Sequence, residues 1–173
     1  HLPYTDPPFD VPGSTHTWII YTSGTTGTPK GVLQDHRNIA RFMEIYDSGF
    51  HMTPEDRYAT AFSSCTNAGL HDFLLAVSFG ASLHPWKTKR DGAAGLAGWL
   101  LSQRATMLSC APTVFREMTD GLAQGQVFPL TRIIRLWAEP SYRRDFESFR
   151  RHFPHGRLVN RLGSSETGPV CWQ

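Results

Sequence analysis

Short apolar segments alternate with longer amphipathic segments over most of this chain, and that alternation limits the folds open to it. The apolar segments have the length and composition of buried strands and cover residues 57–62, 81–86, 106–110, 133–137 and 157–162. The segments between them show helical spacing and cover residues 69–79, 93–104, 112–122 and 142–153. Strands joined by helices form βαβ units, whose connections make the strands parallel. The sequence therefore predicts an α/β fold, with a mostly parallel sheet and helices on both faces.

The first fifty residues follow a different pattern. Trp18–Thr22 and Gly31–Leu33 read as two short strands that are close enough in sequence to pair as a hairpin. Asp35 is a candidate N-cap for a helix over residues 36–46, where apolar residues recur at helical spacing.

Turn and cap signals set several further boundaries. Gly80 is expected to end the helix over residues 69–79. The polar stretch of residues 87–92 predicts a loop. Ser141 is expected to cap the helix over residues 142–153.

Charge and hydropathy exclude two classes of partner. The chain holds 17 Lys and Arg against 15 Asp and Glu, and the 17 are not gathered into one long run. A nucleic-acid interface is therefore not expected. The longest apolar runs fall far short of a membrane-spanning helix, and no signal-peptide pattern is present. No membrane partner is expected.

The cysteines point to a reducing compartment. Cys65, Cys110 and Cys171 lie far apart, without metal-ligand spacing, and an odd count gives no disulfide framework. These features are typical of cytoplasmic proteins, so we expect a cytoplasmic location. No structural metal is expected.

In a parallel sheet, ligands bind beyond the carboxyl ends of the strands. The residues that follow the expected strands are 63–69, 111–112, 138–140 and 163–168. Functional side chains are therefore expected in these four segments.

The stretch Tyr21–Gly31 is rich in glycine and hydroxyl groups and directly follows an apolar strand end. Gly24 and Gly27 let the backbone turn with positive φ and approach a ligand closely. Hydroxyls and backbone N–H groups can then face an anion together, and Lys30 adds a compact positive charge. Polyphosphate suits such a loop, and a glycine- and threonine-rich hairpin turn is the simpler alternative. The loop is not a Walker A motif, because Pro29 stands where the second glycine would be.

This loop resembles the signature loop of the adenylate-forming superfamily, which comprises acyl- and aryl-CoA ligases, luciferases and the adenylation domains of nonribosomal peptide synthetases. Residues 33–38 resemble the segment that follows the loop in that family, and residues 160–168 resemble its second ATP motif. The resemblance implies that the loop holds the β- and γ-phosphates of ATP. The implied phosphate-binding residues are Thr22, Ser23, Gly24, Thr25, Thr26, Gly27 and Lys30.

The second motif implies a metal site. By the resemblance, Glu166 ligates Mg²⁺, a hard cation that takes carboxylate and phosphate oxygens. Lys30 and Glu166 are the implied catalytic residues of this chain. ATP and Mg²⁺ are the implied cofactors.

An adenine site is implied at two strand ends. Asn160 would hydrogen-bond the adenine edge. Leu162 stands where the family usually has an aromatic residue, so nucleotide affinity is expected to be weaker. The other implied adenine-binding residues are Ala138, Glu139 and Gly163.

The implied acyl pocket is where the chain departs furthest from the family. Asn67 stands where amino-acid-activating domains carry an Asp, and a neutral amide cannot offset a buried ammonium. Trp137 replaces a glycine, and it either lines the pocket or packs in the core. His71 either faces the pocket or lies on the surface. Arg161 is expected to be solvated, with the pocket as the alternative, and Ala68 completes the implied pocket.

The resemblance also implies a larger enzyme. The family's ribose-binding Asp, its hinge and its mobile C-terminal domain with a catalytic lysine have no counterpart in residues 1–173. We therefore interpret residues 1–173 as a partial AMP-binding (adenylation) domain that also lacks the preceding segment. The isolated fragment is expected to be inactive.

The implied reaction joins a small carboxylic acid to AMP, and then forms a thioester on the phosphopantetheine of a carrier protein or on CoA. Asn67 argues against an ordinary α-amino acid, and Trp137 argues against a long acyl chain. The alternative is a degenerate nucleotide-binding module without turnover. An unrelated ATPase or kinase is disfavoured, because the sequence has no Walker A or kinase motif.

Overall fold

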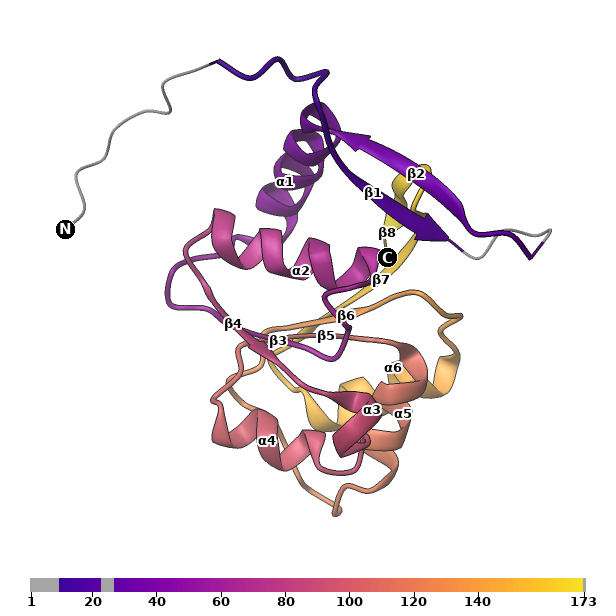
Figure 1. Cartoon of the computed structure of the whole chain (residues 1–173). Helices are drawn as coiled ribbons and strands as arrows, with labels where there is room; N and C mark the ends of the chain where they lie inside the picture. The colour runs from indigo at the N-terminus through magenta and orange to yellow at the C-terminus, as the bar shows by residue number, and fades with distance from the viewer. Residues whose placement is uncertain (1–9, 23–26, 173) are drawn as a thin grey trace.

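The computed structural model describes residues 10–22 and 27–172, and of residues 47, 48 and 168–172 it describes the backbone alone. Within these residues the chain forms a two-stranded antiparallel sheet and a six-stranded sheet. Figure 1 shows the small sheet beyond one end of the large sheet, whose two faces carry helices.

The two-stranded sheet is the hairpin that the sequence predicts. Strand β1 (His16–Thr22) pairs antiparallel with β2 (Lys30–Asp35). Helix α1 (His36–Phe50) follows directly, and the Asp35 carboxylate accepts a hydrogen bond of 2.9 Å from the backbone N–H of Asn38. The hairpin and the Asp35 cap are confirmed, and α1 continues for one further turn beyond its expected end.

The six-stranded sheet has the order β4-β3-β5-β6-β7-β8. Its strands are β3 (Arg57–Thr60), β4 (Ser82–Pro85), β5 (Met107–Cys110), β6 (Ile133–Leu136), β7 (Arg157–Ser164) and β8 (Gly168–Trp172). The first five run parallel, as the alternating pattern predicts. β8 was not predicted and pairs antiparallel with β7. A tight β7–β8 turn therefore replaces the loop expected after the last strand.

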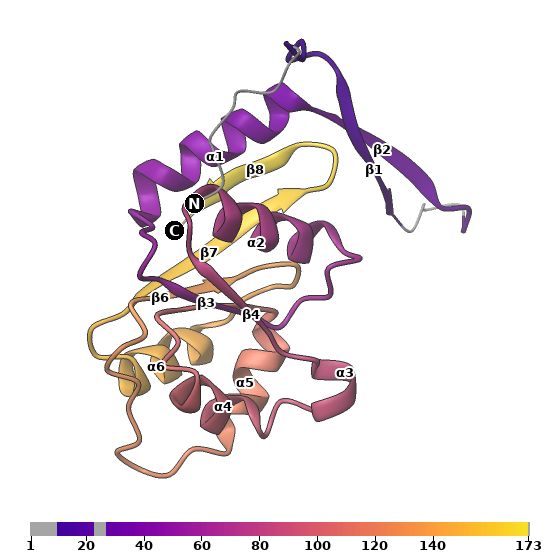
Figure 2. The ribbon, with the colours of Figure 1, turned by 60° about the vertical axis from the view of Figure 1, so that its left-hand side comes forward.

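Helices cover both faces of this sheet. Besides α1 they are α2 (Asn67–Ser78), α3 (Thr88–Asp91), α4 (Leu96–Ser102), α5 (Pro112–Asp120) and α6 (Arg143–His152). Figure 2 shows α1 and α2 on one face and α4, α5 and α6 on the other. The expected fold class, a mostly parallel sheet covered on both faces, is confirmed.

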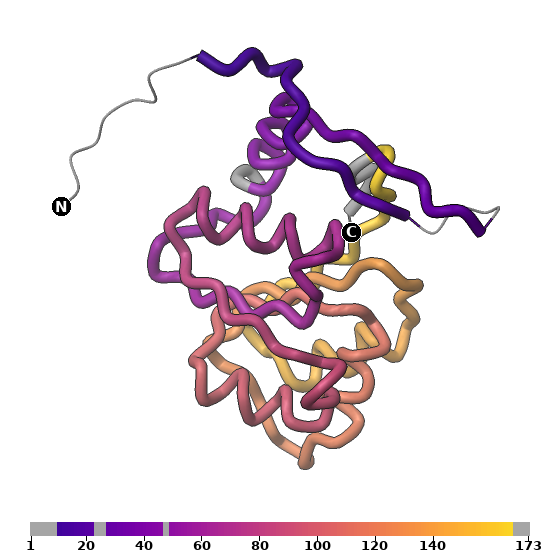
Figure 3. Tube along the Cα trace, viewed as in Figure 1, coloured from indigo at the N-terminus to yellow at the C-terminus, as the bar shows by residue number. Residues whose placement is uncertain are grey.

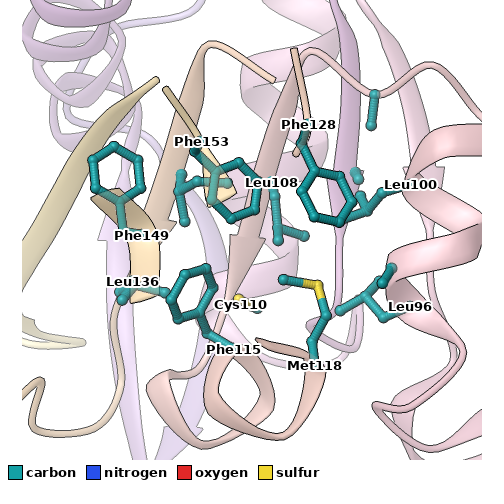
Figure 4. Close-up of a cluster of buried hydrophobic side chains, with 14 residues drawn as sticks. Leu96, Leu100, Leu108, Cys110, Phe115, Met118, Phe128, Leu136, Phe149 and Phe153 are labelled. Atoms are coloured by element: carbon teal, nitrogen blue, oxygen red, sulfur yellow. The ribbon is translucent and has the colours of Figure 1, made fainter. Parts of the chain in front are cut away.

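Two apolar cores lie on either side of the sheet. Met107 packs with α1 and α2, whereas its neighbour Leu108 packs with α4, α5 and α6, as alternation along a strand requires. Figure 4 shows the second core, where Phe115 and Phe153 are fully buried. Burying one such side chain contributes about 1.5–3 kcal/mol. The sheet is therefore held from both sides, and the ends of its strands are fixed in place.

Two local predictions were wrong. The single-turn helix α3 occupies the polar stretch expected to be a loop. Ser141 does not cap α6, because its hydroxyl donates a hydrogen bond of 3.0 Å to the Asn160 side chain. The carboxylate of Asp145 instead accepts a hydrogen bond of 2.7 Å from the backbone N–H of Tyr142 and holds the start of the helix.

The fold brings distant parts of the chain together. Figure 3 shows the β1–β2 hairpin, near the start of the chain, and the yellow end of β7, near its other end, in the same part of the molecule. Gln34 on β2 donates a side-chain hydrogen bond of 2.8 Å to the backbone oxygen of Ser165 in the β7–β8 turn. Among the helices described, none has the length and apolar character needed to cross a membrane.

Candidate active site

Three segments meet beside the carboxyl ends of β6 and β7: the hairpin, the start of α2 and the β7–β8 turn. Ser165 in the turn is their common partner. Its backbone oxygen accepts from Gln34, and its hydroxyl lies 3.5 Å from the side-chain nitrogen of Asn67 at the start of α2. These contacts bring together motifs that lie up to 131 residues apart in the sequence.

The described residues of the predicted phosphate loop lie where β1 ends and β2 begins. Thr22 and Lys30 face each other across its neck as a register pair. Gly27 has φ +81°, a backbone conformation that favours glycine, and Lys30 is exposed. Ser23, Gly24, Thr25 and Thr26 lie outside the described residues. Among the described residues of the loop, Lys30 thus places an exposed ammonium group at the start of β2.

Glu166 lies in the β7–β8 turn, whose shape Ser164 fixes. The Ser164 hydroxyl accepts hydrogen bonds of 3.2 Å from the backbone N–H groups of both Glu166 and Thr167. The Glu166 side chain is exposed. A side-chain hydrogen bond from Ser164, a bond to its own backbone N–H and the charge of Lys30 hold the pKa of Glu166 below its usual value. Glu166 is therefore ionised at neutral pH. The charge of Lys30, which lies near the other end of the chain, contributes to the lowering of its pKa.

The carboxylate of Glu166 fits a magnesium ion that is held mainly by phosphate. No group of three or more His, Cys, Asp or Glu that could hold a metal occurs among the residues with described side chains. Mg²⁺ is commonly bound through one or two carboxylates, with phosphate and water supplying the other oxygens. The single exposed carboxylate of Glu166 meets that requirement and does not suit a metal bound by protein alone.

The predicted adenine-binding residues lie at the ends of two neighbouring strands. Asn160 on β7 is paired in register with Leu136, the last residue of β6. The Asn160 side-chain oxygen accepts a hydrogen bond of 3.0 Å from Ser141. Leu162 is 67% exposed and offers an apolar surface next to Gly163. The strand ends thus present an edge with hydrogen-bonding groups beside an apolar surface.

The segment after β6 has an unusual backbone. Ala138 has φ +74°, in the left-handed region that favours glycine. The next residue, Glu139, accepts hydrogen bonds from both the backbone N–H and the hydroxyl of Thr113 at the start of α5. The carboxylate of Glu139 is therefore engaged with α5.

A cleft of about 450 Å³ opens beside these strand ends. It is lined from β1 by Tyr21, from α2 by Asn67 and Ala68, and from the sheet by Trp137, Arg161 and Gly163. Four of the five predicted acyl-pocket residues and two of the predicted adenine-binding residues, Ala138 and Gly163, therefore share one cleft. The fifth pocket residue, His71, lines a neighbouring cavity that also contains Glu166.

Trp137 belongs to both the core and the cleft. Its side chain is 7% exposed, and its indole nitrogen donates a hydrogen bond of 3.1 Å to the hydroxyl of Ser109. The guanidinium groups of Arg161 and Arg135 lie 4.2 Å and 4.5 Å from its ring centroid. Cation–π contacts of this kind hold the ring in one orientation.

His71 is buried beside Trp137 and does not lie on the surface. The structure therefore excludes the surface position, which was one of the two alternatives that the sequence left open for His71. It is 8% exposed, and its ring stacks parallel to Trp137 with 6.1 Å between centroids. Its Nδ1 atom lies 3.4 Å from a guanidinium nitrogen of Arg161. Burial, followed by the charges of Arg161 and Arg135, lowers the pKa of His71 to about 3. His71 is therefore a neutral acceptor for Arg161 at neutral pH.

Arg161 is buried, so the expectation of a solvated side chain was wrong. It is 5% exposed. Along β7 it points to the same side of the sheet as Val159, toward α1, and its guanidinium lies over the Phe42 ring at 5.3 Å. Burial lowers the pKa of Arg161 to about 10, and the charge of Arg135 acts in the same direction. Alternation of side chains along β7 could have predicted that Arg161 is buried. The sequence analysis instead interpreted this segment by its family motif.

A buried ion pair beneath the cleft was missed by the sequence analysis. Arg135 on β6 and Asp72 on α2 are both fully buried, with 2.8 Å between nitrogen and oxygen. The same carboxylate accepts hydrogen bonds from the hydroxyls of Tyr58 and Thr60. Although burial acts to lower it, the charge of Asp72 raises the pKa of Arg135 above its usual value. The signal for this pair in the sequence was a single charged residue, Asp72 or Arg135, inside each of two otherwise apolar segments.

The chain was compared with protein-family models and with curated sequences. The family model described as "AMP-binding enzyme" matches residues 5–173. Surfactin synthase subunit 2 of Bacillus subtilis is 27% identical over 163 residues, which is 92% of this chain and 4% of that protein. Syringomycin synthase SyrB1 of Pseudomonas syringae is 33% identical over 121 residues, which is 69% of this chain and 19% of that protein. The chain thus spans a small part of these relatives.

Solved structures share the fold. VinN superposes with a TM-score of 0.83 at 22% identity, covering 95% of this chain and 41% of VinN. The o-succinylbenzoate coenzyme A synthetase MenE of Bacillus subtilis, solved with AMP, gives a TM-score of 0.80 at 22% identity, covering 93% of this chain and 32% of MenE.

Proposed function

Because the chain belongs to the AMP-binding enzyme family, we propose that the protein containing it activates a small carboxylic acid with MgATP to give an acyl-adenylate and pyrophosphate. The observation that carries this proposal is the meeting of the Lys30 hairpin and the Glu166 turn through the Gln34–Ser165 hydrogen bond, next to a cleft. A cation, an ionised carboxylate and a cleft for the acid are what this reaction needs side by side.

Charge neutralisation falls to the hairpin and the turn. Lys30, together with Thr22, Ser23, Gly24, Thr25, Thr26 and Gly27, would bind the β- and γ-phosphates, and Glu166 would hold Mg²⁺. Bound MgATP supplies an electrophilic α-phosphorus and a pyrophosphate leaving group. Lys30 stabilises the negative charge that grows on the leaving group. Glu166, ionised at neutral pH, keeps its carboxylate available as a ligand.

Orientation of the nucleotide falls to the strand ends. Asn160 is held by Ser141 and would present its amide N–H₂ to the adenine edge. The exposed side chain of Leu162 would pack against the base. Ala138, Glu139 and Gly163 would contribute backbone atoms close to these groups. This arrangement would orient the α-phosphate toward the acid, and such positioning of two reactants is a large part of catalysis.

The cleft would hold the rest of the acid. Asn67 offers a neutral side chain, and its oxygen is buried without a hydrogen-bond partner among the described residues. A hydroxyl or neutral amine fits that oxygen better than an α-ammonium group does. Trp137 closes the cleft against long chains. The small side chain of Ala68 leaves room beside Asn67 and Trp137. His71 positions Arg161 by accepting a hydrogen bond from its guanidinium group.

The acceptor of the acyl group would be a thiol. Relatives of this chain include peptide synthases, and its structural neighbours include a coenzyme A synthetase. The phosphopantetheine of a carrier protein and CoA are therefore both suitable acceptors. We further propose that the chain acts within a longer cytoplasmic polypeptide, since it spans 41% or less of the relatives and structures described above. Residues 1–173 alone would then be inactive.

A degenerate nucleotide-binding module is the second candidate. Leu162, Trp137 and Asn67 each differ from the residue usual in the family. The exposure of Leu162 favours this candidate most, because a leucine stacks on a base less well than an aromatic ring does. Such a module would keep nucleotide binding and lose turnover.

Pyrophosphate exchange by the full-length protein, measured with MgATP and a panel of small acids, distinguishes the two candidates. The enzyme proposal expects exchange with one class of acid. Lys30→Ala and Glu166→Gln are each expected to lower kcat/KM at least about 100-fold. Lys89→Ala on α3 and Glu117→Gln on α5 are exposed matched controls that should leave the rate unchanged. ATP binding without exchange for any acid would favour the degenerate module.

A further inference from the structure

Arg161 is a buried cation without an acidic partner among the residues whose side chains are described. The residue lines the cleft and is 5% exposed. Its Nε atom is buried without a hydrogen-bond partner, and no ion pair to Arg161 occurs among the residues with described side chains. Its described contacts are a neutral histidine, His71, and the aromatic rings of Trp137, Phe42 and Tyr46. A buried charge left in this way is costly unless something offsets it.

The charges beneath the cleft do not balance. Two guanidinium groups, Arg135 and Arg161, are buried there with one carboxylate, Asp72. Asp72 is already committed, because it pairs with Arg135 at 2.8 Å and accepts from the hydroxyls of Tyr58 and Thr60. His71 adds no negative charge. The described part of this cluster therefore carries one net positive charge, and that charge belongs to the guanidinium that borders the cleft.

The guanidinium is also held in place before anything binds. The Trp137 ring lies 4.2 Å from it, the Phe42 ring lies 5.3 Å from it, and His71 accepts from one of its nitrogens at 3.4 Å. Trp137 is in turn fixed by its hydrogen bond to Ser109. A side chain restrained on several sides binds an anion at little cost in conformational entropy. Such support is typical of a binding group and goes beyond what a solvated arginine needs.

We infer that the acid activated at this site carries a second anionic group, a carboxylate, which pairs with Arg161 at the floor of the cleft. The inference rests on the proposed function and narrows its substrate to small dicarboxylic acids. One carboxylate is presented to the nucleotide, and the other restores charge balance at Arg161. Trp137 limits the length of the chain between them, and the buried oxygen of Asn67 accepts from any hydroxyl on it.

The test compares each dicarboxylic acid with its own monoamide, which has nearly the same shape and one charge fewer. Malonate, succinate and glutarate and their monoamides are assayed by pyrophosphate exchange in the full-length protein. Direct binding of the same compounds is measured by calorimetry. For at least one pair, the dicarboxylate is expected to exceed its monoamide at least tenfold in kcat/KM and in affinity. Monoamides that match or exceed their dicarboxylates in both measurements overturn the inference and leave the proposed function standing.

Variants at one position locate the effect. Arg161→Gln is expected to lower the dicarboxylate-to-monoamide ratio at least tenfold, and Arg161→Lys should keep a preference for the dicarboxylate. Arg144→Gln removes an exposed arginine on α6 and should leave the ratio unchanged. A ratio that is the same in Arg161→Gln and in the unmodified protein overturns the inference.

Calorimetry separates this inference from the proposed function. If no acid supports exchange, the proposed function fails, and binding alone decides the role of Arg161. Dicarboxylate binding that Arg161→Gln abolishes then supports the anion subsite. Binding of dicarboxylate and monoamide with equal affinity, or of neither, overturns it.

Discussion

At the residue scale, the cluster under the cleft combines groups that stabilise the fold with one that opposes it. Asp72 and Arg135 satisfy each other. Arg161, in contrast, is buried without an ion-pair partner among the described side chains, and burial lowers its pKa to about 10. Groups that serve a ligand often lower the stability of the free protein in this way. Removing the charge of Arg161 should therefore stabilise the ligand-free fold, whereas replacing an ordinary core residue destabilises it.

The stability prediction for Arg161 follows from this opposition. Arg161→Met, which keeps much of the side-chain length and removes the charge, is expected to raise the free energy of unfolding by roughly 1–3 kcal/mol in the absence of ligand. Urea unfolding of the ligand-free full-length protein provides the measurement. Arg144→Met on the exposed face of α6 is the matched control and should change stability by less than about 0.5 kcal/mol. A loss of stability in Arg161→Met would show that the guanidinium is a structural group.

His71 gives a prediction about pH. Its pKa of about 3 in the folded protein lies below the usual value of 6.5, so the unfolded chain binds the proton more readily. Stability from this group is therefore complete above pH 6.5 and is lost as the pH falls from 6.5 toward 3. Between pH 7.5 and pH 5 the loss amounts to about 2 kcal/mol.

His71→Gln retains an acceptor for Arg161 and removes the titration. The variant should therefore lose about 2 kcal/mol less than the unmodified protein when urea unfolding is compared at pH 7.5 and pH 5. His155→Gln changes an exposed histidine and serves as the control. Parallel pH dependence in the His71 variant and the unmodified protein would show that His71 titrates normally in the fold.

At the element scale, the start of α2 is fitted closely to the segment before it. The Thr66 hydroxyl accepts from the Gly69 backbone at 3.1 Å and donates to the backbone oxygen of Ser63 at 2.7 Å. A Cβ atom on Gly69 would lie 2.1 Å from that same oxygen. Because Asn67 and Ala68 extend from this turn into the cleft, any shift of the turn also changes the cleft.

Gly69→Ala is therefore expected to destabilise the protein by about 1–3 kcal/mol and to weaken acid binding, because helix and loop must separate. Gly98→Ala on α4 is the matched control: it also lies in a helix, and its Cβ would meet nothing within 4 Å. That control should gain up to about 1 kcal/mol from helix propensity. Urea unfolding of both variants tests the contrast, and equal effects would contradict the close packing at Gly69.

The sequence predicted elements better than it predicted contacts between them. The five parallel strands and the hairpin were found because apolar periodicity is a local property. β8 was missed because it forms only against β7, and the family motif at Glu166 had been interpreted as a loop. Ser141 lost its capping role to a contact with Asn160 on another element, a kind of competition that local patterns do not report.

At the scale of the whole molecule, the candidate site joins parts of the chain that local patterns treat separately. Sequence motifs predicted roles for Lys30 and Glu166, and the parallel sheet explained why residues after the strands would meet. The sequence did not show that Arg161 is buried without a carboxylate, or that Asp72 and Arg135 pair beneath it. Those facts depend on which face of the sheet α1 and α2 cover, and a local pattern leaves that open.

The hairpin and the β7–β8 turn should respond to the nucleotide as one unit. The hydrogen bond from Gln34 to Ser165 joins them, and the charge of Lys30 lowers the pKa of Glu166. If both hold the same MgATP, binding must slow amide hydrogen exchange in both segments together, because each loses freedom only when the ligand bridges them. Exchange in α4, on the opposite face of the sheet, should stay unchanged.

Hydrogen exchange of the full-length protein, followed by mass spectrometry with and without saturating MgATP, measures this directly. Peptides that contain Gly27–Lys30 and Ser164–Glu166 should gain protection at the same nucleotide concentration. Lys30→Ala should shift both protection curves to higher MgATP by a similar factor, since one binding event controls both segments. Protection of the hairpin alone would mean that Glu166 does not share the ligand, and the magnesium role proposed for it would then have to be abandoned.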